Sequence, residues 1–452
     1  MDLLLFPNQL FPIEIFKKQN IKTIHFIEDP LYYGDRPDIK LKLNQLRILF
    51  MHVIHKIYIQ ELKKHYPVKY YSIEDPIPEI KEGFMFEPCD IHIPRKYKNI
   101  KVVNSPSFII SIEELISFFE GREDKRLQHS QLYNFAKEKL NILQDTKNMD
   151  VYNRELYSSK IELPKNPYRH IFSSKTIWKE GIQWLEKSFF KNNPKGNLDW
   201  DTLIETYLIY LPLTIKDVRL WMYDFFKERF MNYGKYQDVI IPEHPLLYHS
   251  GLSIYLNNGM ITPKEVVDMA LKYQDKTTLA GLEGFIRQII GWREYARLYY
   301  YMVPKKIYRQ NIFKNSLKMN KSLYTGTTEI PLVNKTIQYA FNYGYINHIQ
   351  RLMVMSNYMT LWGYQPDMIY KWMYEFSLDS YDWVMIFNCY SMGSWSDGGK
   401  AMRKPYISSA NYLLKMSNES KGEWVDRWNE KFNRFLTKHR TILKHTQLAN
   451  LL

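Results

Sequence analysis

The sequence predicts an N-terminal α/β unit with a Rossmann-like parallel sheet, followed by an all-helical C-terminal unit. Short apolar runs alternate with longer helical patterns in the first part of the chain, which is typical of a parallel α/β sheet. From Asp199 onward, strand patterns disappear and amphipathic helices follow one another, separated by Gly and Pro. A chain of 452 residues also exceeds one ordinary core, so two domains are expected.

Each element is predicted from its own pattern. A helix is expected over 41–63, and PNQ rather than a glycine-rich phosphate loop follows the first strand, so a dinucleotide-binding loop is not predicted. The turn signals NPYRH and KNNPKGN indicate a polar, irregular connector. Strands are expected at 3–6, 23–27, 68–73 and 100–103, and the division is an α/β domain 1–123, a connector 124–198 and a helical domain 199–452.

Charge and cysteine content limit the possible functions. The chain has 62 Lys and Arg against 48 Asp and Glu, and the net charge of +14 favours a polyanionic partner, with nucleic acid the first candidate. A merely basic soluble protein is the alternative. The two cysteines, Cys89 and Cys389, exclude a disulfide framework and a four-thiolate metal site. With no signal peptide or long apolar run, a soluble intracellular protein is expected.

Two segments place polar residues at helix starts and faces. LLYHSGLSIYLNNG, residues 246–259, offers the hydroxyls of Ser250 and Ser253 where a helix begins, and free N–H groups there attract phosphate. A plain N-cap is the alternative. GLEGFIRQIIGWREYARLYY, residues 281–300, sets Glu283 and Arg287 at helical spacing near Trp292. A salt-bridged helix face would give the same pattern.

NYGYINHIQRLMV, residues 342–354, predicts His348 in the middle of a helix, with Arg351 one turn away. A structural histidine is the alternative, because one histidine is no catalytic constellation. Residues 380–413 are less easily explained as a plain connection between two helices. They combine acidic, amide, basic and aromatic side chains around a glycine pair, which suits a surface that meets a phosphate backbone: Asp382, Asn388, Lys400, Arg403, Lys404, Tyr406 and Tyr412.

Together these segments resemble the cryptochrome and DNA photolyase family, and more narrowly its iron–sulfur bacterial cryptochromes and (6-4) photolyases. The resemblance rests on YGKYQD, HSGLS, EGFIRQIIGWREYARLYY, NHIQRLMV, SDGG and KPYISSANY in this order. It covers nearly the whole chain and is strongest over 230–415. It implies an N-terminal α/β antenna domain and an all-helical C-terminal domain that binds FAD.

The resemblance also implies roles for residues around the cofactor. Tyr236, Ser250 and Ser253 would lie near the FAD phosphates, and Arg351 near the flavin ring with Asp379 or Asp382 as its partner. Asp382 and Asn388 would face the polar edge of the ring. The complete cofactor-binding set is Tyr236, His249, Ser250, Leu252, Ser253, Glu283, Arg287, Arg351, Asp379, Asp382 and Asn388.

The position of His348 implies repair of (6-4) photoproducts in UV-damaged DNA. Relatives that repair cyclobutane dimers generally carry Asn at this position. The imidazole of a histidine, with an ordinary pKa of about 6.5, can instead supply a proton to the lesion. Reduced FAD would supply the electron. The catalytic set is His348, Tyr406, Tyr412 and Asn347; the DNA-binding set is Trp292, Lys400, Arg403 and Lys404; Trp372 and Trp383 would transfer electrons, and no metal is expected.

The sequence departs from the bacterial relatives in two ways. Leu332 and KMSNESKGEWV replace the cysteines that hold an iron–sulfur cluster, so no cluster is expected, and aromatic packing by 424–435 would close the gap. Asn8 stands where a lumazine-binding Asp would be expected, so no antenna pigment is predicted. A monomer that contacts no membrane is expected. The alternatives are a blue-light receptor that binds FAD without repair, a cyclobutane-dimer photolyase, and an inactive DNA-binding descendant.

Overall fold

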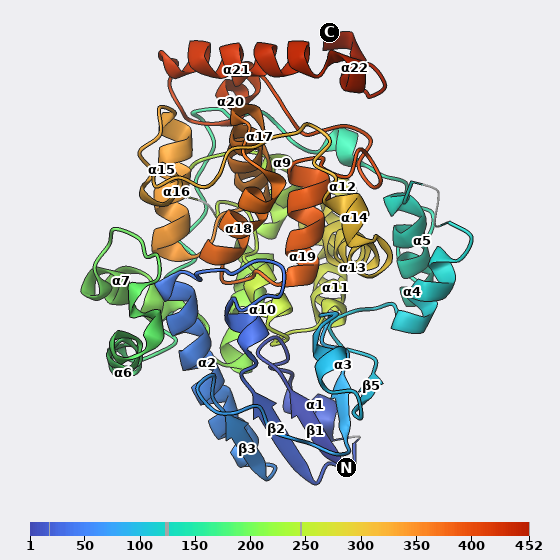
Figure 1. The fold of residues 1–452 in the computed structure, drawn as a ribbon, viewed down its shortest axis with the longest axis vertical. Helices are drawn as coiled ribbons and strands as arrows, with labels where there is room; N and C mark the ends of the chain where they lie inside the picture. Colours follow the sequence, from blue (N-terminus) through green and yellow to red (C-terminus); the bar gives the residue numbers. More distant parts are fainter. Residues whose placement is uncertain (18, 123–125, 245, 452) are drawn as a thin grey trace.

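The computed structural model describes residues 1–17, 19–122, 126–244 and 246–451. A five-stranded, wholly parallel sheet with the order β3-β2-β1-β4-β5 lies at one end of the molecule, and the helices of the C-terminal half stack beyond it (Figure 1). Leu3 of the central strand stands opposite Ile24 on one side and Phe84 on the other. The strands are β1 (Asp2–Leu5), β2 (Thr23–Ile27), β3 (Val68–Tyr71), β4 (Phe84–Phe86) and β5 (Lys101–Val103).

The expected α/β unit is confirmed, with one strand more than the sequence pattern indicated. β4 has only three residues, too few to establish a period of two, and all three are buried. The predicted helix began too early: α2 (Gln45–Lys63) starts after Asn44, whose side chain accepts a hydrogen bond from the Leu46 N–H. The remaining helices of this unit are α1 (Ile13–Phe16), α3 (Ile93–Lys96) and α4 (Ile112–Phe119).

The connector is irregular only in part: its described residues from 141 to 174 form no α-helix or strand, but the prediction missed two helices. It contains α5 (His129–Leu140) and α6 (Lys175–Lys187). In α6, Trp178, Ile182 and Leu185 are buried at the spacing of one helix face, a signal that was present in the sequence. The expected domain boundary falls on Glu123 and Asp124, which lie outside the described residues, so the division into domains stays a prediction.

From residue 199 on, the described part of the chain is helical, as expected, and it adds no strand to the sheet. Three helices pass through π-helical turns, η7 (Arg287–Trp292), η8 (Gln350–Ser356) and η9 (Phe387–Gly393). The α-helices are α7 (Trp200–Thr206), α8 (Ile215–Glu228), α9 (Tyr233–Tyr236), α10 (Ser253–Asn257), α11 (Pro263–Lys272), α12 (Leu279–Ile286), α13 (Arg293–Met302), α14 (Lys305–Tyr308), α15 (Ser322–Thr325), α16 (Pro331–Tyr343), α17 (Asn357–Trp362), α18 (Pro366–Phe376), α19 (Asp382–Ile386), α20 (Ala410–Met416), α21 (Trp424–Lys438) and α22 (Arg440–Leu443).

Buried ion pairs join the sheet end to the helices. Arg297 on α13 pairs with Glu87, which follows β4, and both side chains are almost wholly buried. Arg293 places its guanidinium over the rings of Phe108 and Trp383. Because an unpaired buried charge is costly, these contacts fix how the two halves meet. No helix in the described ranges has both the length and the apolar character needed to cross a bilayer.

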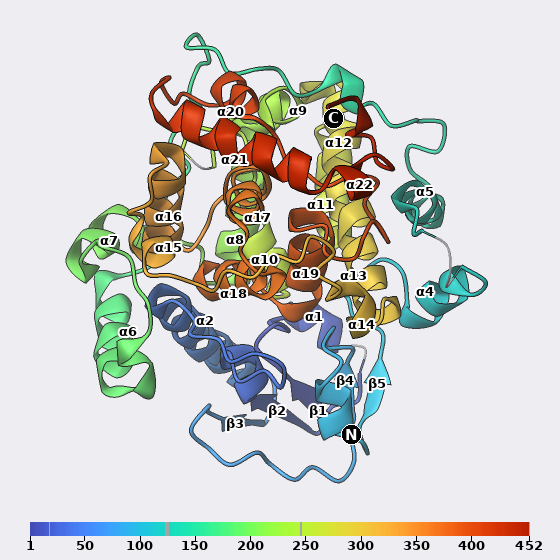
Figure 2. The same cartoon turned by 45° about the horizontal axis from the view of Figure 1, so that its top comes forward.

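The α21 helix runs across the end of the molecule opposite the sheet (Figure 2). Its apolar face buries Trp424, Trp428, Phe432 and Phe435, as the sequence predicted. The Trp428 ring contacts Trp362 of α17 with ring centroids 5.4 Å apart, and its indole N–H donates to the Ser408 carbonyl at 2.9 Å. Aromatic packing therefore anchors the C-terminal segment on the helical half.

Candidate functional site

The three π-helical turns lie where the sequence placed site residues. Arg287 and Trp292 bound η7, Arg351 lies in η8 and Asn388 lies in η9. A π-turn inserts an extra residue into a helix and shifts side chains around its axis, and such turns are frequent at functional sites. The turns thus identify the region between these three helices as the candidate site.

His348 is not in the middle of a helix, which corrects the sequence prediction. Gly344 ends α16 in the left-handed conformation, with φ of +63°, and the next helix begins only at His348. Asn347 caps that helix: its side chain accepts the Gln350 N–H at 3.0 Å, and the Gln350 side chain accepts the Asn347 N–H at 3.3 Å. His348 therefore occupies the first turn, and Asn347 has a capping role.

The His348 side chain is accessible to solvent, yet many protein atoms surround it. Desolvation, together with the positive charges of Arg351 and Arg154, lowers its pKa to about 4. Exposure and desolvation are compatible only if the ring lines a recess. At neutral pH the imidazole is then uncharged, whereas the sequence had suggested a protonated ring.

Arg351 and Asp379 form a two-pronged ion pair beside this recess. The two guanidinium nitrogens donate to the two carboxylate oxygens at 2.8 and 3.1 Å, and Ser253 donates to the same carboxylate at 2.6 Å. Burial alone would raise the pKa of Asp379, but Arg351 and the hydroxyl donors lower it. Of the two partners expected for Arg351, Asp379 is the one that the structure pairs with it.

Asp382, the alternative partner, does not pair with Arg351. Its carboxylate pairs with Arg36, which comes from the sheet end of the molecule, and accepts hydrogen bonds from Tyr300 at 3.0 Å and Tyr370 at 2.6 Å. Asp382 therefore belongs to the contact between the two halves. Asn388 is half-buried and donates to the Val384 carbonyl at 2.8 Å.

The 246–259 segment shows local side-chain hydrogen bonds. Ser250 accepts the Leu252 N–H at 3.2 Å in a turn before α10, but the N-cap of α10 is Leu252, so the N-cap alternative for Ser250 and Ser253 was wrong. The His249 ring lies between the carbonyls of Leu246 and Gln237, at 3.2 and 2.9 Å, and burial lowers its pKa to about 4. Leu252 is buried, and Tyr236 packs on Tyr248 with ring centroids 5.3 Å apart. The segment therefore surrounds the site with ordered, mostly uncharged groups.

Glu283 and Arg287 form the salt-bridged face that was the alternative for 281–300. Both are buried, their side chains meet at 3.1 Å, and Arg287 also pairs with Asp150 of the connector. Trp292 stacks on His129 of α5 with ring centroids 4.0 Å apart. The connector is thus tied to the helices that carry the site.

Arg154 is a site residue that sequence reasoning missed. It belongs to the connector, adopts a positive φ of 70°, and pairs with Asp150 at 3.1 Å and Asp238 at 3.5 Å. Its charge acts on both His348 and Tyr406. A lone arginine in a polar segment without periodicity gives no sequence signal, so only the docking of the connector reveals it.

The remaining predicted residues lie in three environments. Tyr406 and Tyr412 are half-buried, and burial raises the pKa of each phenol. Trp372 and Trp383 are buried; the Trp372 indole N–H donates to the Leu323 carbonyl at 2.6 Å, and Trp383 packs on Phe108 with centroids 5.2 Å apart. Lys400 and Lys404 are half-buried and Arg403 is exposed. Their roles in catalysis, electron transfer and DNA binding stay predictions.

Comparison with known sequences gives a clear relative. The chain is 30% identical over 356 residues to a (6-4) photolyase of Agrobacterium fabrum, which spans 75% of this chain and 67% of the relative. Two uncharacterized proteins of Acanthamoeba polyphaga mimivirus match shorter segments, one with 52% identity over 85 residues (19% of this chain, 69% of that protein) and one with 41% over 112 residues (24% and 85%). A search against family models gave no match.

Comparison with solved structures agrees on the fold. A class III photolyase of Agrobacterium tumefaciens superposes with a TM-score of 0.61, covering 96% of this chain and 86% of that one. A Synechocystis cryptochrome superposes with a TM-score of 0.58, covering 100% and 89%. Each is 14% identical, so these two show the fold alone. With the 30% identity to the (6-4) photolyase, the chain belongs to the cryptochrome and photolyase family.

Proposed function

We infer that the protein is a light-driven DNA repair enzyme of the (6-4) photolyase type, with FAD as cofactor and UV-damaged DNA as substrate. The observation that carries this proposal is the placement of His348 on the first turn of a helix, in a recess that also holds the Arg351–Asp379 pair. A titratable ring at a helix start is free to point away from the helix body. It is therefore available to a ligand in the recess.

The residues around the recess fit a polyanionic cofactor such as FAD. Arg229 is 1% exposed, and its three guanidinium nitrogens find no hydrogen-bond acceptor among the described residues. Its guanidinium lies over the rings of Trp221 and Phe225, at 5.5 and 5.6 Å from their centroids. Arg229 contributes to the lowered pKa of His249, so positive potential extends into the site. Such potential favours a diphosphate.

The protein side of the mechanism is the delivery of one proton. Bound FAD in its reduced state supplies a light-driven electron to the lesion. Arg351 is held by Asp379 and Ser377 and keeps a fixed charge beside His348. With cofactor and DNA bound, their phosphates would offset the charges of Arg351 and Arg154 and would raise the pKa of His348 from about 4, so that its ring N–H would act as the acid.

The other predicted roles belong to the same proposal. Tyr406 and Tyr412 would order the lesion, and Lys400, Arg403 and Lys404 would bind phosphates. Trp292 would contact the DNA, while Trp372 and Trp383 would relay electrons. The domains would be an antenna-type α/β domain 1–123 and a helical FAD-binding domain 199–452, joined by the connector 124–198.

A repair assay with two substrates tests the proposal. Purified, FAD-loaded protein is reduced and incubated under blue light with oligonucleotides that carry either a (6-4) photoproduct or a cyclobutane dimer. Restoration of the (6-4) substrate is expected from the unaltered protein and is lost in His348→Asn, while the variant keeps its flavin. His65→Asn, which changes an exposed histidine in the turn after α2, is the matched control and retains repair.

The lowered pKa of His348 favours a second candidate, a blue-light receptor without repair. A ring that stays neutral at pH 7 is a poor proton donor, and a receptor has no need of one. Light-dependent flavin reduction with inactivity on both substrates would support the receptor. Repair of the cyclobutane dimer by both the unaltered protein and His348→Asn would instead indicate a cyclobutane-dimer photolyase.

A further inference from the structure

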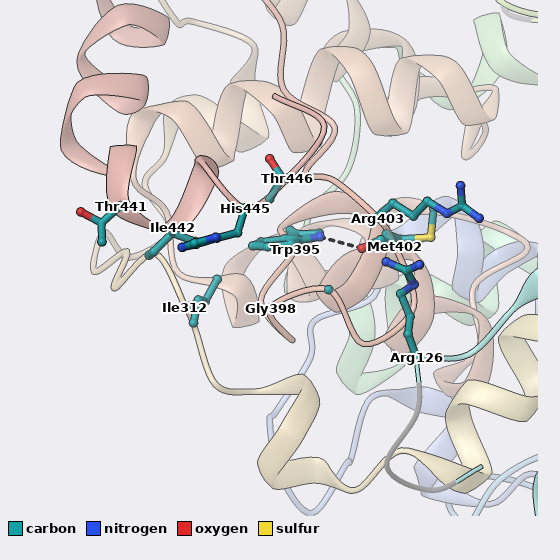
Figure 3. A pocket seen from close by; sticks show the side chains of 11 residues that line it. Arg126, Ile312, Trp395, Gly398, Met402, Arg403, Thr441, Ile442, His445 and Thr446 are labelled. Atoms are coloured by element: carbon teal, nitrogen blue, oxygen red, sulfur yellow. Dashed lines mark hydrogen bonds between the residues drawn. The ribbon is translucent and has the colours of Figure 1, made fainter. Parts of the chain in front are cut away.

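A cavity lies on the helical half of the molecule, apart from His348 and the Arg351–Asp379 pair. It has a volume of about 400 Å³ between the 395–403 loop and the C-terminal residues after α21, and its lining does not include His348, Arg351 or Asp379 (Figure 3). Small-molecule sites have volumes of about 300–1,000 Å³. The sequence had singled out this loop through its SDGG motif, and the recess around His348 does not account for the motif.

Two arginine side chains line the cavity without a compensating acid. Arg126 and Arg403 border it and are exposed, and its lining contains no Asp or Glu. Neither arginine has an ion pair or a hydrogen bond within the described ranges of the chain. Guanidinium groups free of carboxylates, at the mouth of a cavity, present their paired N–H donors to phosphate oxygens.

An ordered aromatic wall adjoins the two arginines. The Trp395 indole N–H donates to the Met402 carbonyl at 2.9 Å, and Phe313 stacks on the ring with centroids 5.8 Å apart. In Figure 3, the guanidinium groups of Arg126 and Arg403 lie on one side of Trp395, and Ile312, Ile442 and His445 lie on the other. The cavity therefore has both guanidinium groups at one end, while the aliphatic side chains of Ile312 and Ile442 lie at the other end beside Thr441 and His445.

The glycine pair of SDGG makes this wall possible. Gly398 and Gly399 have φ of +66° and +96°, conformations that other residues rarely adopt. A Cβ at Gly399 would stand 2.9 Å from Cζ2 of Trp395. Any larger residue there would push the indole out of place. The motif thus has a structural purpose, which is to bring the loop close against the ring that borders the cavity.

We propose that this cavity binds a nucleoside phosphate, with its phosphate between Arg126 and Arg403 and its base beside Trp395, Ile312 and Ile442. An elongated ligand with one anionic and one planar end matches the two ends of the cavity. A single nucleotide of a bound DNA strand and a free mononucleotide share this chemistry. Arg403 is also one of the residues proposed above to bind DNA phosphates, so the case of a DNA strand rests on that proposed function, whereas the binding of a free mononucleotide does not.

Binding is measured in the dark on the full chain saturated with FAD, so that the cofactor site is filled. The probe is adenosine 5′-monophosphate with a fluorescent label on the ribose, followed by anisotropy. Unlabelled AMP, adenosine, inorganic phosphate and an undamaged oligodeoxyadenylate serve as competitors. Arg126→Gln and Arg403→Gln each remove one charge from the cavity, and Arg440→Gln on α22 removes one exposed charge outside its lining.

Saturable binding of the labelled nucleotide is expected, with adenosine and phosphate competing at least tenfold more weakly than AMP. Each cavity variant weakens binding by about tenfold, and Arg440→Gln leaves it unchanged. An equal loss of oligonucleotide binding identifies the DNA strand as the source, and a loss confined to AMP identifies a free nucleotide. The proposal is overturned if no saturable binding occurs, if both cavity variants bind as the unaltered chain does, or if Arg440→Gln weakens binding equally.

Discussion

Replacement of Asp379 by Asn tests whether the Arg351–Asp379 pair organises the site. The carboxylate accepts two hydrogen bonds from Arg351, at 2.8 and 3.1 Å, and one from Ser253 at 2.6 Å. An amide keeps one acceptor oxygen but removes the charge. Arg351 would then remain largely buried without a counter-ion. The backbone contacts of residue 379 are retained in this variant.

The expected cost follows from the burial of the pair. The two side chains are 14% and 5% exposed for Arg351 and Asp379. Removal of one partner from a buried pair costs about 3–5 kcal/mol. The partial exposure of Arg351 and the surviving amide oxygen place the loss at the lower limit, about 3 kcal/mol. Ser253→Ala removes a single hydrogen bond to the same carboxylate and should cost about 1–2 kcal/mol, which makes it the matched control.

Chemical denaturation at several pH values measures both effects. The folded-state pKa of Asp379 is lowered below its ordinary value near 3.9. Its contribution to stability is therefore fully present above the unfolded pKa and is lost as the pH falls through the folded pKa. The difference between unaltered and Asp379→Asn protein should be constant above about pH 5 and shrink below about pH 4.

Two results would refute this reasoning. The first is an unfolding free energy of Asp379→Asn within 1 kcal/mol of the unaltered protein at pH 7. The second is a stability difference that does not change between pH 6 and pH 3. A double-mutant cycle with Arg351→Gln supplies the coupling energy of the pair, and a value near zero would show that the two side chains act independently.

Three further changes test the arrangement around the site. Arg154→Gln should raise the pKa of His348 above about 4, because it removes one of the charges that lowers it; an NMR titration that finds no rise contradicts the placement of Arg154. Arg297→Gln should cost about 3–5 kcal/mol by leaving Glu87 buried without a cation, whereas Arg219→Gln, an exposed pair, should cost less than about 1 kcal/mol in the same denaturation assay. Trp428→Ala should cost about 3–5 kcal/mol, and a much smaller loss would mean that α21 is only loosely packed.

The sequence by itself determined the elements whose patterns are long and local. The run at 23–27 became β2 with the predicted bounds, because its β-branched and aromatic residues suit a buried parallel strand and the one buried polar side chain, His25, finds partners in Asp2 and Tyr71. The helical character of the second half followed from repeated amphipathic spacing. The resemblance to the photolyase family also came from short sequence motifs, and the comparison with a (6-4) photolyase confirmed it.

Local pattern failed where a few residues or a distant partner decide the outcome. β4 forms because β5 pairs with all three of its residues and β1 with two of them, and no periodicity can appear in so short a segment. The helix expected through His348 is interrupted because Gly344 takes the left-handed conformation and Asn347 caps a new start. An apolar repeat does not reveal such a break.

The charged partners of the site were decided only by tertiary structure. Asp379 and Asp382 lie three positions apart in sequence, yet one pairs with Arg351 and the other with Arg36. Arg154 reaches the site because the connector docks on the helices, through Asp150 and Arg287 among other contacts. Sequence spacing supplies the types of charge, but burial makes an unpaired charge so costly that the three-dimensional neighbours, rather than the neighbours in sequence, select each partner.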